Sequence, residues 1–138
     1  MTALSATSSP ASRQILLIDD EPDVRLVVQT CLEKLAGWMV ISAASGEEGL
    51  LKVYSEKPDA IVLDIMMPIM DGYMVLEALL AKPETQSIPV VFLTAKANSS
   101  ELDQYKALGV KGTIRKPFNP LTLHREIAAA LGWDFDTW

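Results

Sequence analysis

The sequence predicts an α/β fold in which five parallel strands form one sheet, in the order 2-1-3-4-5, with helices on both faces. Short apolar runs rich in Ile, Val and Leu are typical of buried strands in a parallel sheet. Segments with helical spacing of apolar residues alternate with these runs, which favours a doubly wound arrangement with right-handed crossovers. Most of the runs also end in a polar residue, at the sheet edge where such folds bind ligands.

Local signals justify the elements of the first half. Strands are predicted at residues 14–18, 38–42 and 60–64. Pro22 suits the first position of the helix after the first strand, and Gly37 ends that helix. Ser45 and Glu48 form a capping box, which opens a second helix that runs to about residue 56.

The second half continues the same alternation, with strands predicted at residues 88–93 and 110–115. Asp71 caps the third helix, and Pro83 ends it. The fourth helix, residues 98–108, is amphipathic but rather polar. Asn119 caps a fifth helix that starts at residue 120, and its histidine, His124, is expected on the surface.

Composition excludes several classes of protein. The net charge is -6 and no cluster of Lys or Arg occurs, which argues against nucleic acid as a direct partner. No apolar stretch approaches the ~20 residues of a membrane span, and the N-terminus has no signal-peptide pattern. We therefore expect a cytoplasmic protein.

The 138 residues predict one folded domain over residues 13–132 between two tails. Residues 1–12 consist largely of Ala, Ser and Thr, which predicts a disordered segment. Residues 133–138 contain three aromatic side chains, which suggests docking or homodimer formation. The alternative is that Trp133 and Phe135 pack on their own domain.

Polar residues at the ends of four strands form the candidate site. Asp19 and Asp20 follow the first strand, Asp64 ends the third, Thr94 follows the fourth and Lys116 follows the fifth. Because the carboxyl ends of parallel strands share one edge, these side chains should meet there. Crowded carboxylates need a cation and the ammonium needs an anion. A divalent metal ion and a phosphoryl group would together compensate the charges of these side chains.

Structural alternatives exist for each member of this site. Asp64 could cap a helix, but Asp71 already does so, which leaves Asp64 free to attack phosphorus as a nucleophile. Asp19 and Asp20 could simply favour a helix N-terminus. However, two charges ~4 Å apart repel by about 4 kcal/mol at an effective dielectric near 20, and Mg²⁺ would remove that conflict. Thr94 could be an ordinary strand residue, whereas Lys116 should pair with Asp64.

Four motifs resemble the receiver domain of two-component response regulators over about residues 13 to 132. They are Asp19-Asp20-Glu21, Leu63 to Gly72, Leu93 to Lys96, and Lys116-Pro117-Phe118. The resemblance implies a flavodoxin-like (βα)5 receiver fold. It also implies a single-domain phospho-acceptor switch rather than a turnover enzyme, which signals through contacts with an unknown downstream protein.

The same resemblance implies a role for each site residue. Asp64 would accept a phosphoryl group from a sensor histidine kinase or a histidine phosphotransfer protein. Thr94 would donate a hydrogen bond to that group, and Lys116 would pair with it. Mg²⁺ would be held by Asp19, Asp20, Asp64 and the backbone carbonyl of Met66.

One position departs from the family pattern, and other functions remain open. Relatives usually carry Tyr or Phe three residues before the lysine as a signalling switch, whereas this chain has Thr113. A pseudo-receiver that binds partners without phosphorylation is the main alternative. An aspartyl-phosphate phosphatase is disfavoured because Met66 stands where such enzymes usually carry a second Asp. A flavin-binding or dinucleotide-binding protein is disfavoured because no Gly-x-Gly-x-x-Gly follows the first strand.

Overall fold

One parallel sheet forms the centre of the molecule, as the sequence predicts. The structure is a computed structural model that describes residues 13–95 and 98–133. Its strands have the order β2-β1-β3-β4-β5, and neighbouring strands pair in parallel. The strands are β1 (Gln14–Ile18), β2 (Met39–Ala43), β3 (Ala60–Asp64), β4 (Val90–Thr94) and β5 (Gly112–Arg115).

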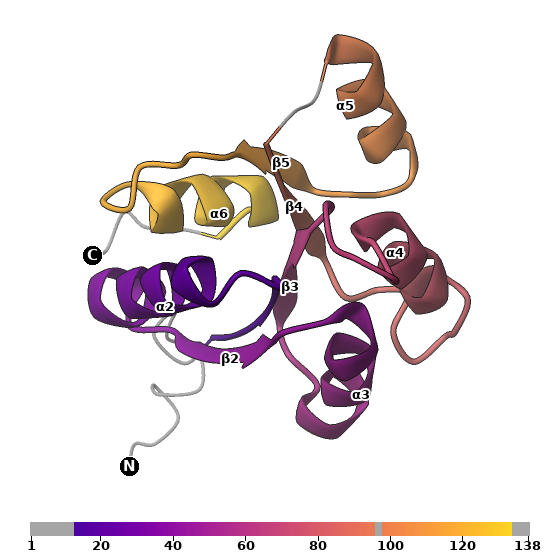
Figure 1. Cartoon of the computed structure of the whole chain (residues 1–138), viewed down its shortest axis with the longest axis horizontal. Helices are drawn as coiled ribbons and strands as arrows, with labels where there is room; N and C mark the ends of the chain where they lie inside the picture. Colours follow the sequence, from indigo (N-terminus) through magenta and orange to yellow (C-terminus); the bar gives the residue numbers. More distant parts are fainter. Residues whose placement is uncertain (1–12, 96–97, 134–138) are drawn as a thin grey trace.

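Helices cover both faces of this sheet (Figure 1). They are α2 (Pro22–Cys31) with its π-helical continuation η2 (Leu32–Ala36), α3 (Gly46–Glu56), α4 (Gly72–Leu80), α5 (Ser99–Ala107) and α6 (Leu123–Leu131). In Figure 1, α2 and α6 lie on one side, whereas α3, α4 and α5 lie on the other. The predicted doubly wound architecture is therefore confirmed.

Alternation along the strands builds a separate core on each face. In β1, Ile15 and Leu17 belong to the core under α2 and α6, whereas Leu16 and Ile18 belong to the core under α3, α4 and α5. This follows because successive strand residues point to opposite faces. The double burial explains why the strands are continuous apolar runs, and it places their polar end residues at the sheet edge.

The last helix begins later than the sequence predicts. The Asn119 side chain accepts a hydrogen bond from the Leu121 N–H at 2.9 Å, which stabilises a turn, and regular helix begins only at Leu123. The expectation for His124 was wrong, because this side chain is 6 % exposed. His124 precedes Ile127 by three positions, so it lies on the helix face that packs against the sheet.

Trp133 packs on its own domain, in agreement with the alternative for the C-terminal aromatic residues. Its ring meets Trp38 edge-to-face with centroids 5.1 Å apart, and the Arg13 guanidinium lies 4.6 Å from its centroid. Residues 1–12 and 134–138 lie outside the described residues, so the predictions for both tails stay predictions. Within residues 13–95 and 98–133, each helix is too short or too polar to cross a bilayer.

Candidate functional site

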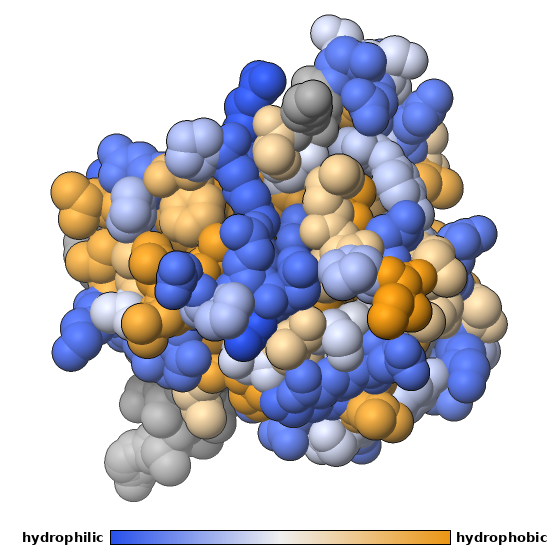
Figure 2. All heavy atoms as spheres, in the orientation of Figure 1, coloured by the Kyte–Doolittle hydropathy of each residue, from blue (hydrophilic) through white to orange (hydrophobic). Residues whose placement is uncertain are grey.

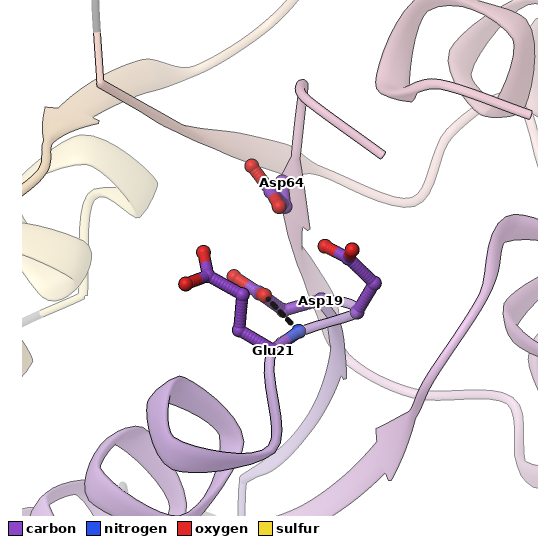
Figure 3. A group of neighbouring side chains, drawn as sticks. Asp19, Glu21 and Asp64 are labelled. Carbon is purple, nitrogen blue, oxygen red and sulfur yellow. Dashed lines mark hydrogen bonds between the residues drawn. The ribbon is translucent and has the colours of Figure 1, made fainter. Parts of the chain in front are cut away.

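Four carboxylates converge where β1 and β3 end, and Figure 3 labels three of them, Asp19, Glu21 and Asp64. Together with Asp20 they each place one carboxylate oxygen within 4.8 Å of the others. Asp19 is 0 % exposed and Asp64 is 1 % exposed, because both extend buried strands. The structure therefore brings together the acidic residues that the sequence predicts, and it adds Glu21.

Lys116 provides the positive charge of the site. Its Nζ lies 2.9 Å from Asp19 Oδ2, 3.2 Å from Glu21 Oε1 and 3.4 Å from Asp64 Oδ1. The predicted pair with Asp64 is present, but the shortest contact is with Asp19. Glu21 was missed as a member of this site, although its position directly after Asp19 and Asp20 was the signal that could have found it.

The hydrogen bonds leave particular carboxylate oxygens available. Asp19 Oδ1 accepts from the Glu21 N–H at 2.9 Å, and its Oδ2 accepts from Lys116, so both oxygens have partners. Asp64 Oδ1 accepts from the Met66 N–H at 3.1 Å. Asp64 Oδ2 is buried and has no hydrogen-bond partner among the described residues. No described side chain donates to the Asp20 carboxylate either.

Burial and charge act together on the ionisable groups. The pKa of Asp64 is raised from 3.8 to about 6, first by burial and then by the neighbouring Asp19 charge, while Lys116 and the Met66 N–H act in the opposite direction. Burial acts to lower the pKa of Lys116, but hydrogen bonding and charge at Asp19, then the Asp64 charge, raise it on balance. Lys116 therefore stays protonated, while Asp64 is destabilised as a carboxylate.

The loop after β3 holds Asp64 tightly. The Gly72 N–H donates to the Ile65 carbonyl at 3.0 Å, and a Cβ at Gly72 would lie 2.7 Å from the Asp64 carbonyl oxygen. Only glycine allows α4 to approach β3 this closely. Asp71 accepts from the Met74 N–H at 3.0 Å and caps α4, as predicted, so Asp64 has no capping role.

The same loop presents a strained apolar residue to solvent. Ile69 has a φ of 69°, which lies in the left-handed region, and its side chain is 90 % exposed. This conformation is unusual for a β-branched residue. Met66 is also strongly exposed, so the surface beside Asp64 contains uncovered apolar groups. In Figure 2, hydrophilic residues form a band through the middle of this view, with hydrophobic residues on both sides.

Thr94 ends β4 and separates two cavities. A cavity of about 350 Å³ is lined by Thr94 together with Met66, Glu101 and Tyr105. A smaller one of about 140 Å³ is lined by Thr94, Leu102, Thr113 and Arg115. The Thr94 carbonyl accepts from the Lys116 N–H at 2.7 Å, and the Lys116–Pro117 peptide bond is cis. Backbone pairing thus fixes the predicted Thr94 and Lys116 next to each other.

The fold and the site together define the class of this protein. The sheet order, the helices on both faces and the polar cluster at the carboxyl edge are those of a flavodoxin-like α/β protein. The family model of the response regulator receiver domain matches residues 15–128. The chain belongs to this family, that of the receiver domains of two-component response regulators.

Individual relatives agree with this assignment. The probable transcriptional regulator ycf27 of Porphyridium aerugineum is 40% identical over 118 residues, which are 86% of this chain and 48% of the relative. The alkaline phosphatase synthesis transcriptional regulatory protein PhoP of Bacillus subtilis is 37% identical over 120 residues, 87% of this chain and 49% of the relative. The chain thus spans about half the length of the curated relatives it matches.

A solved structure gives the same result for the fold. The chemotaxis protein CheY4 of Vibrio cholerae superposes with a TM-score of 0.79 at 31% sequence identity. The match covers 86% of this chain and 98% of that chain. The receiver fold predicted from the sequence is therefore confirmed.

Proposed function

We propose that this chain is a phospho-acceptor switch in which Asp64 receives a phosphoryl group from a phosphohistidine. The observation that carries the proposal is the buried, unpartnered Oδ2 of Asp64, in a carboxylate whose other oxygen, Oδ1, lies 3.4 Å from the Lys116 Nζ. This oxygen accepts no hydrogen bond from the described residues, and burial of an unpartnered carboxylate oxygen destabilises the fold. A role as the nucleophile that attacks phosphorus would explain why this oxygen is left unpartnered.

The transfer forms one bond to phosphorus and breaks another. An oxygen of the ionised Asp64 carboxylate attacks the phosphorus atom, and an O–P bond forms as the P–N bond to the donor imidazole breaks. The electron pair of the P–N bond stays on the imidazole nitrogen, which takes up a proton. Lys116 lies 3.4 Å from Asp64 Oδ1, where its charge can balance the phosphoryl oxygens. Thr94, at the end of the adjacent strand β4, is the proposed hydroxyl donor to the same oxygens.

The acidic cluster fits a divalent cation. Lys116 contacts three of the four carboxylates, and the Asp20 carboxylate and Asp64 Oδ2 have no donors among the described residues. Mg²⁺ prefers such oxygen ligands and, when bound, would neutralise charge on the phosphoryl oxygens. We assign its protein ligands to Asp20, Asp64 and the Met66 carbonyl. Asp19 would assist from a distance, because both of its oxygens already have partners.

The partners follow from this role and are part of the proposal. The phosphodonor would be a sensor histidine kinase or a histidine phosphotransfer protein, and the output would be a contact with a downstream protein. Exposed Met66 and Ile69 beside the acceptor support a protein donor, because they offer apolar surface around the charged centre. Single-domain status, homodimer formation and a cytoplasmic location stay predictions from the sequence.

Two other functions fit the site less well. A pseudo-receiver would not need Lys116 Nζ to lie 3.4 Å from Asp64 Oδ1, nor four carboxylate oxygens to lie within 4.8 Å of one another. A phosphatase would need a general acid two residues after the nucleophile, and Met66 occupies that position with an exposed thioether. We therefore propose an acceptor that is modified and later hydrolysed, rather than a turnover enzyme.

Intact mass spectrometry tests the proposal. After incubation with acetyl phosphate and Mg²⁺, the wild-type chain should gain the mass of one phosphoryl group, and Asp64→Asn should gain none. Asp71→Asn is the matched control, because it removes a carboxylate from the same loop but keeps a side chain that can cap α4. Equal labelling of the wild type and Asp64→Asn would disprove the assignment of the acceptor.

A further inference from the structure

A single tyrosine anchors helix α5 to the sheet. Tyr105 is the one buried side chain that α5 contributes among the described residues, and it is 2 % exposed. Leu102 is only partly buried against the same core, and most of the remaining helix surface is exposed. The position of α5 therefore depends on how the Tyr105 ring fits beneath it.

That ring lies in an aromatic cluster between β4 and α4. Tyr105 meets Phe92 of β4 edge-to-face with centroids 5.1 Å apart, and it is tilted against Tyr73 of α4 at 5.5 Å. Burial raises the pKa of the Tyr105 hydroxyl, and hydrogen bonding with Tyr73 and then the charge and hydrogen bond of Glu101 contribute in the same direction. The ring and the hydroxyl thus each have defined partners.

The ring also borders the space beside Thr94. Both residues line the cavity of about 350 Å³, so a displacement of the Thr94 side chain changes the space next to Tyr105. On the other side of Thr94, the small Thr113 leaves a cavity of about 140 Å³ rather than a packed contact. Of the two neighbours, only Tyr105 offers a large rigid group that can respond to Thr94.

Glu101 connects Tyr105 to the start of the helix. The Glu101 carboxylate accepts from the Asn98 N–H at 3.1 Å, while the Asn98 side chain accepts from the Glu101 N–H at 2.9 Å. These two bonds form the capping box of α5. Glu101 and Tyr105 line the same cavity, and charge and hydrogen bonding at Glu101 contribute to the raised pKa of Tyr105, so a shift of the ring alters the support of the helix N-terminus.

We propose that Tyr105 is the positioning residue that transmits the modification of Asp64 to α5, and that Thr113 takes no part in this transmission. The inference rests on the function proposed above. The phosphoryl group draws Thr94 toward the acceptor, the space beside the Tyr105 ring changes, and the ring moves with its hydroxyl. Its contact with Glu101 then carries the change to the capping box, at the outer end of the α3–α4–α5 layer (Figure 1).

Residue-resolved amide exchange on the full chain tests this, with modification measured by intact mass in the same samples. In the wild type, acetyl phosphate should change the exchange of amides 99–107 several-fold. Tyr105→Leu, which keeps an apolar anchor, should lose this response throughout α5. Tyr105→Phe, which removes only the hydroxyl, should lose it at the first turn alone. Thr113→Ala should respond as the wild type does.

The outcomes separate this inference from the proposed function. A response in both Tyr105 variants equal to that of the wild type, at equal added mass, would overturn the inference. So would a response abolished by Thr113→Ala, or a fully modified wild type in which α5 does not change. In those cases the acceptor chemistry stands. A wild type that gains no mass removes the proposed function and the inference together.

Discussion

Two regions of the carboxyl edge of the sheet are built differently. At the end of β1 and β3, the functional carboxylates extend buried strands, and the loop after Asp64 is held by the close approach of Gly72. At the end of β4 and β5, the edge strand β5 has one buried residue, Ile114, and the neighbouring α5 depends on Tyr105. The first region fixes atoms in place, whereas the second has few contacts that resist movement.

This difference suggests a division of tasks along one edge. Acceptor chemistry needs reacting groups held in a narrow range of geometry, which the doubly buried strands provide. A signal needs an element whose position costs little to change, which a polar helix with one anchor provides. If the two regions are energetically separate, a substitution in one of them should leave the other unchanged.

Removal of the Asp20 carboxylate, in the region where β1 and β3 end, should have the largest effect. A cation that binds only the folded chain stabilises it by about 2.7 kcal/mol at a hundredfold excess over Kd. Mg²⁺ should therefore raise the melting temperature of the wild type, and Asp20→Ala should lose most of that rise. The same variant should be more stable than the wild type in EDTA, because one repulsive charge is gone.

Asp23→Ala is the control for this measurement. Asp23 lies in the first turn of α2 but outside the acidic cluster, so its Mg²⁺ response should match that of the wild type. A Mg²⁺-induced shift that persists in Asp20→Ala would place the ion elsewhere on the protein.

Gly72→Ala should destabilise the chain by about 1–3 kcal/mol, because the added methyl group has no room. Its Cβ would lie 2.7 Å from the Asp64 carbonyl oxygen and from the Ile65 Cα, and neither backbone atom can move freely. Urea unfolding would measure the loss, and phosphorylation by acetyl phosphate should also slow as Asp64 is displaced. Gly46→Ala should cost less, since its near neighbours are side-chain atoms of Met70 and Val75. Equal costs for both variants would contradict the close-approach argument.

Stability in EDTA should fall as the pH rises from about 4 to about 6. The pKa of Asp64 is about 6 in the folded chain, against an ordinary value of 3.8, so the folded state holds more protons than the unfolded state in that window. Stability therefore decreases with rising pH, because deprotonation leaves a buried charge. Urea midpoints at the two ends of the window measure this, and Asp64→Asn should lack this contribution. An identical pH dependence in the two proteins would show that Asp64 is not the group that titrates.

The smallest effect should come from Asn98→Ala, at the start of α5 in the region beside β4 and β5. Loss of the N-cap costs about 1 kcal/mol of helix stability. Faster amide exchange should be confined to α5, while the yield of phosphorylated chain stays unchanged. If the acceptor reaction slowed in proportion to the exchange, the two regions would be coupled more strongly than the structure indicates.

Strand ends were the most predictable part of the site. Asp19, Asp64 and Lys116 follow apolar runs, and parallel topology alone brings such positions to one edge. Glu21 was harder to predict because it follows the strand end by three residues, where side-chain direction depends on how the chain enters α2. Its contact with Lys116 at 3.2 Å exists only in the folded geometry.

Helix α5 and helix α6 show where sequence patterns are insufficient. The burial of Tyr105 could not be deduced from a helix with so few apolar residues, because its partners Phe92 and Tyr73 come from other elements. His124 was placed outside by its polarity, although its spacing from Ile127 indicates the buried face. For His124, the polar residue type predicts exposure whereas the helical spacing predicts burial, and the side chain is buried in the structure.

Among the described residues, Lys116 is the one ammonium that contacts the acidic cluster, and this imbalance of charge affects the electric field outside the site. With these groups ionised, the acidic charges outnumber Lys116, so the entrance to Asp64 repels anions until a cation binds. Salt screens such repulsion within about 10 Å at 0.1 M ionic strength. A small anionic phosphodonor should therefore encounter the metal-free site faster as salt is added. A protein donor with a basic rim should associate more slowly under the same conditions, since salt removes its electrostatic steering.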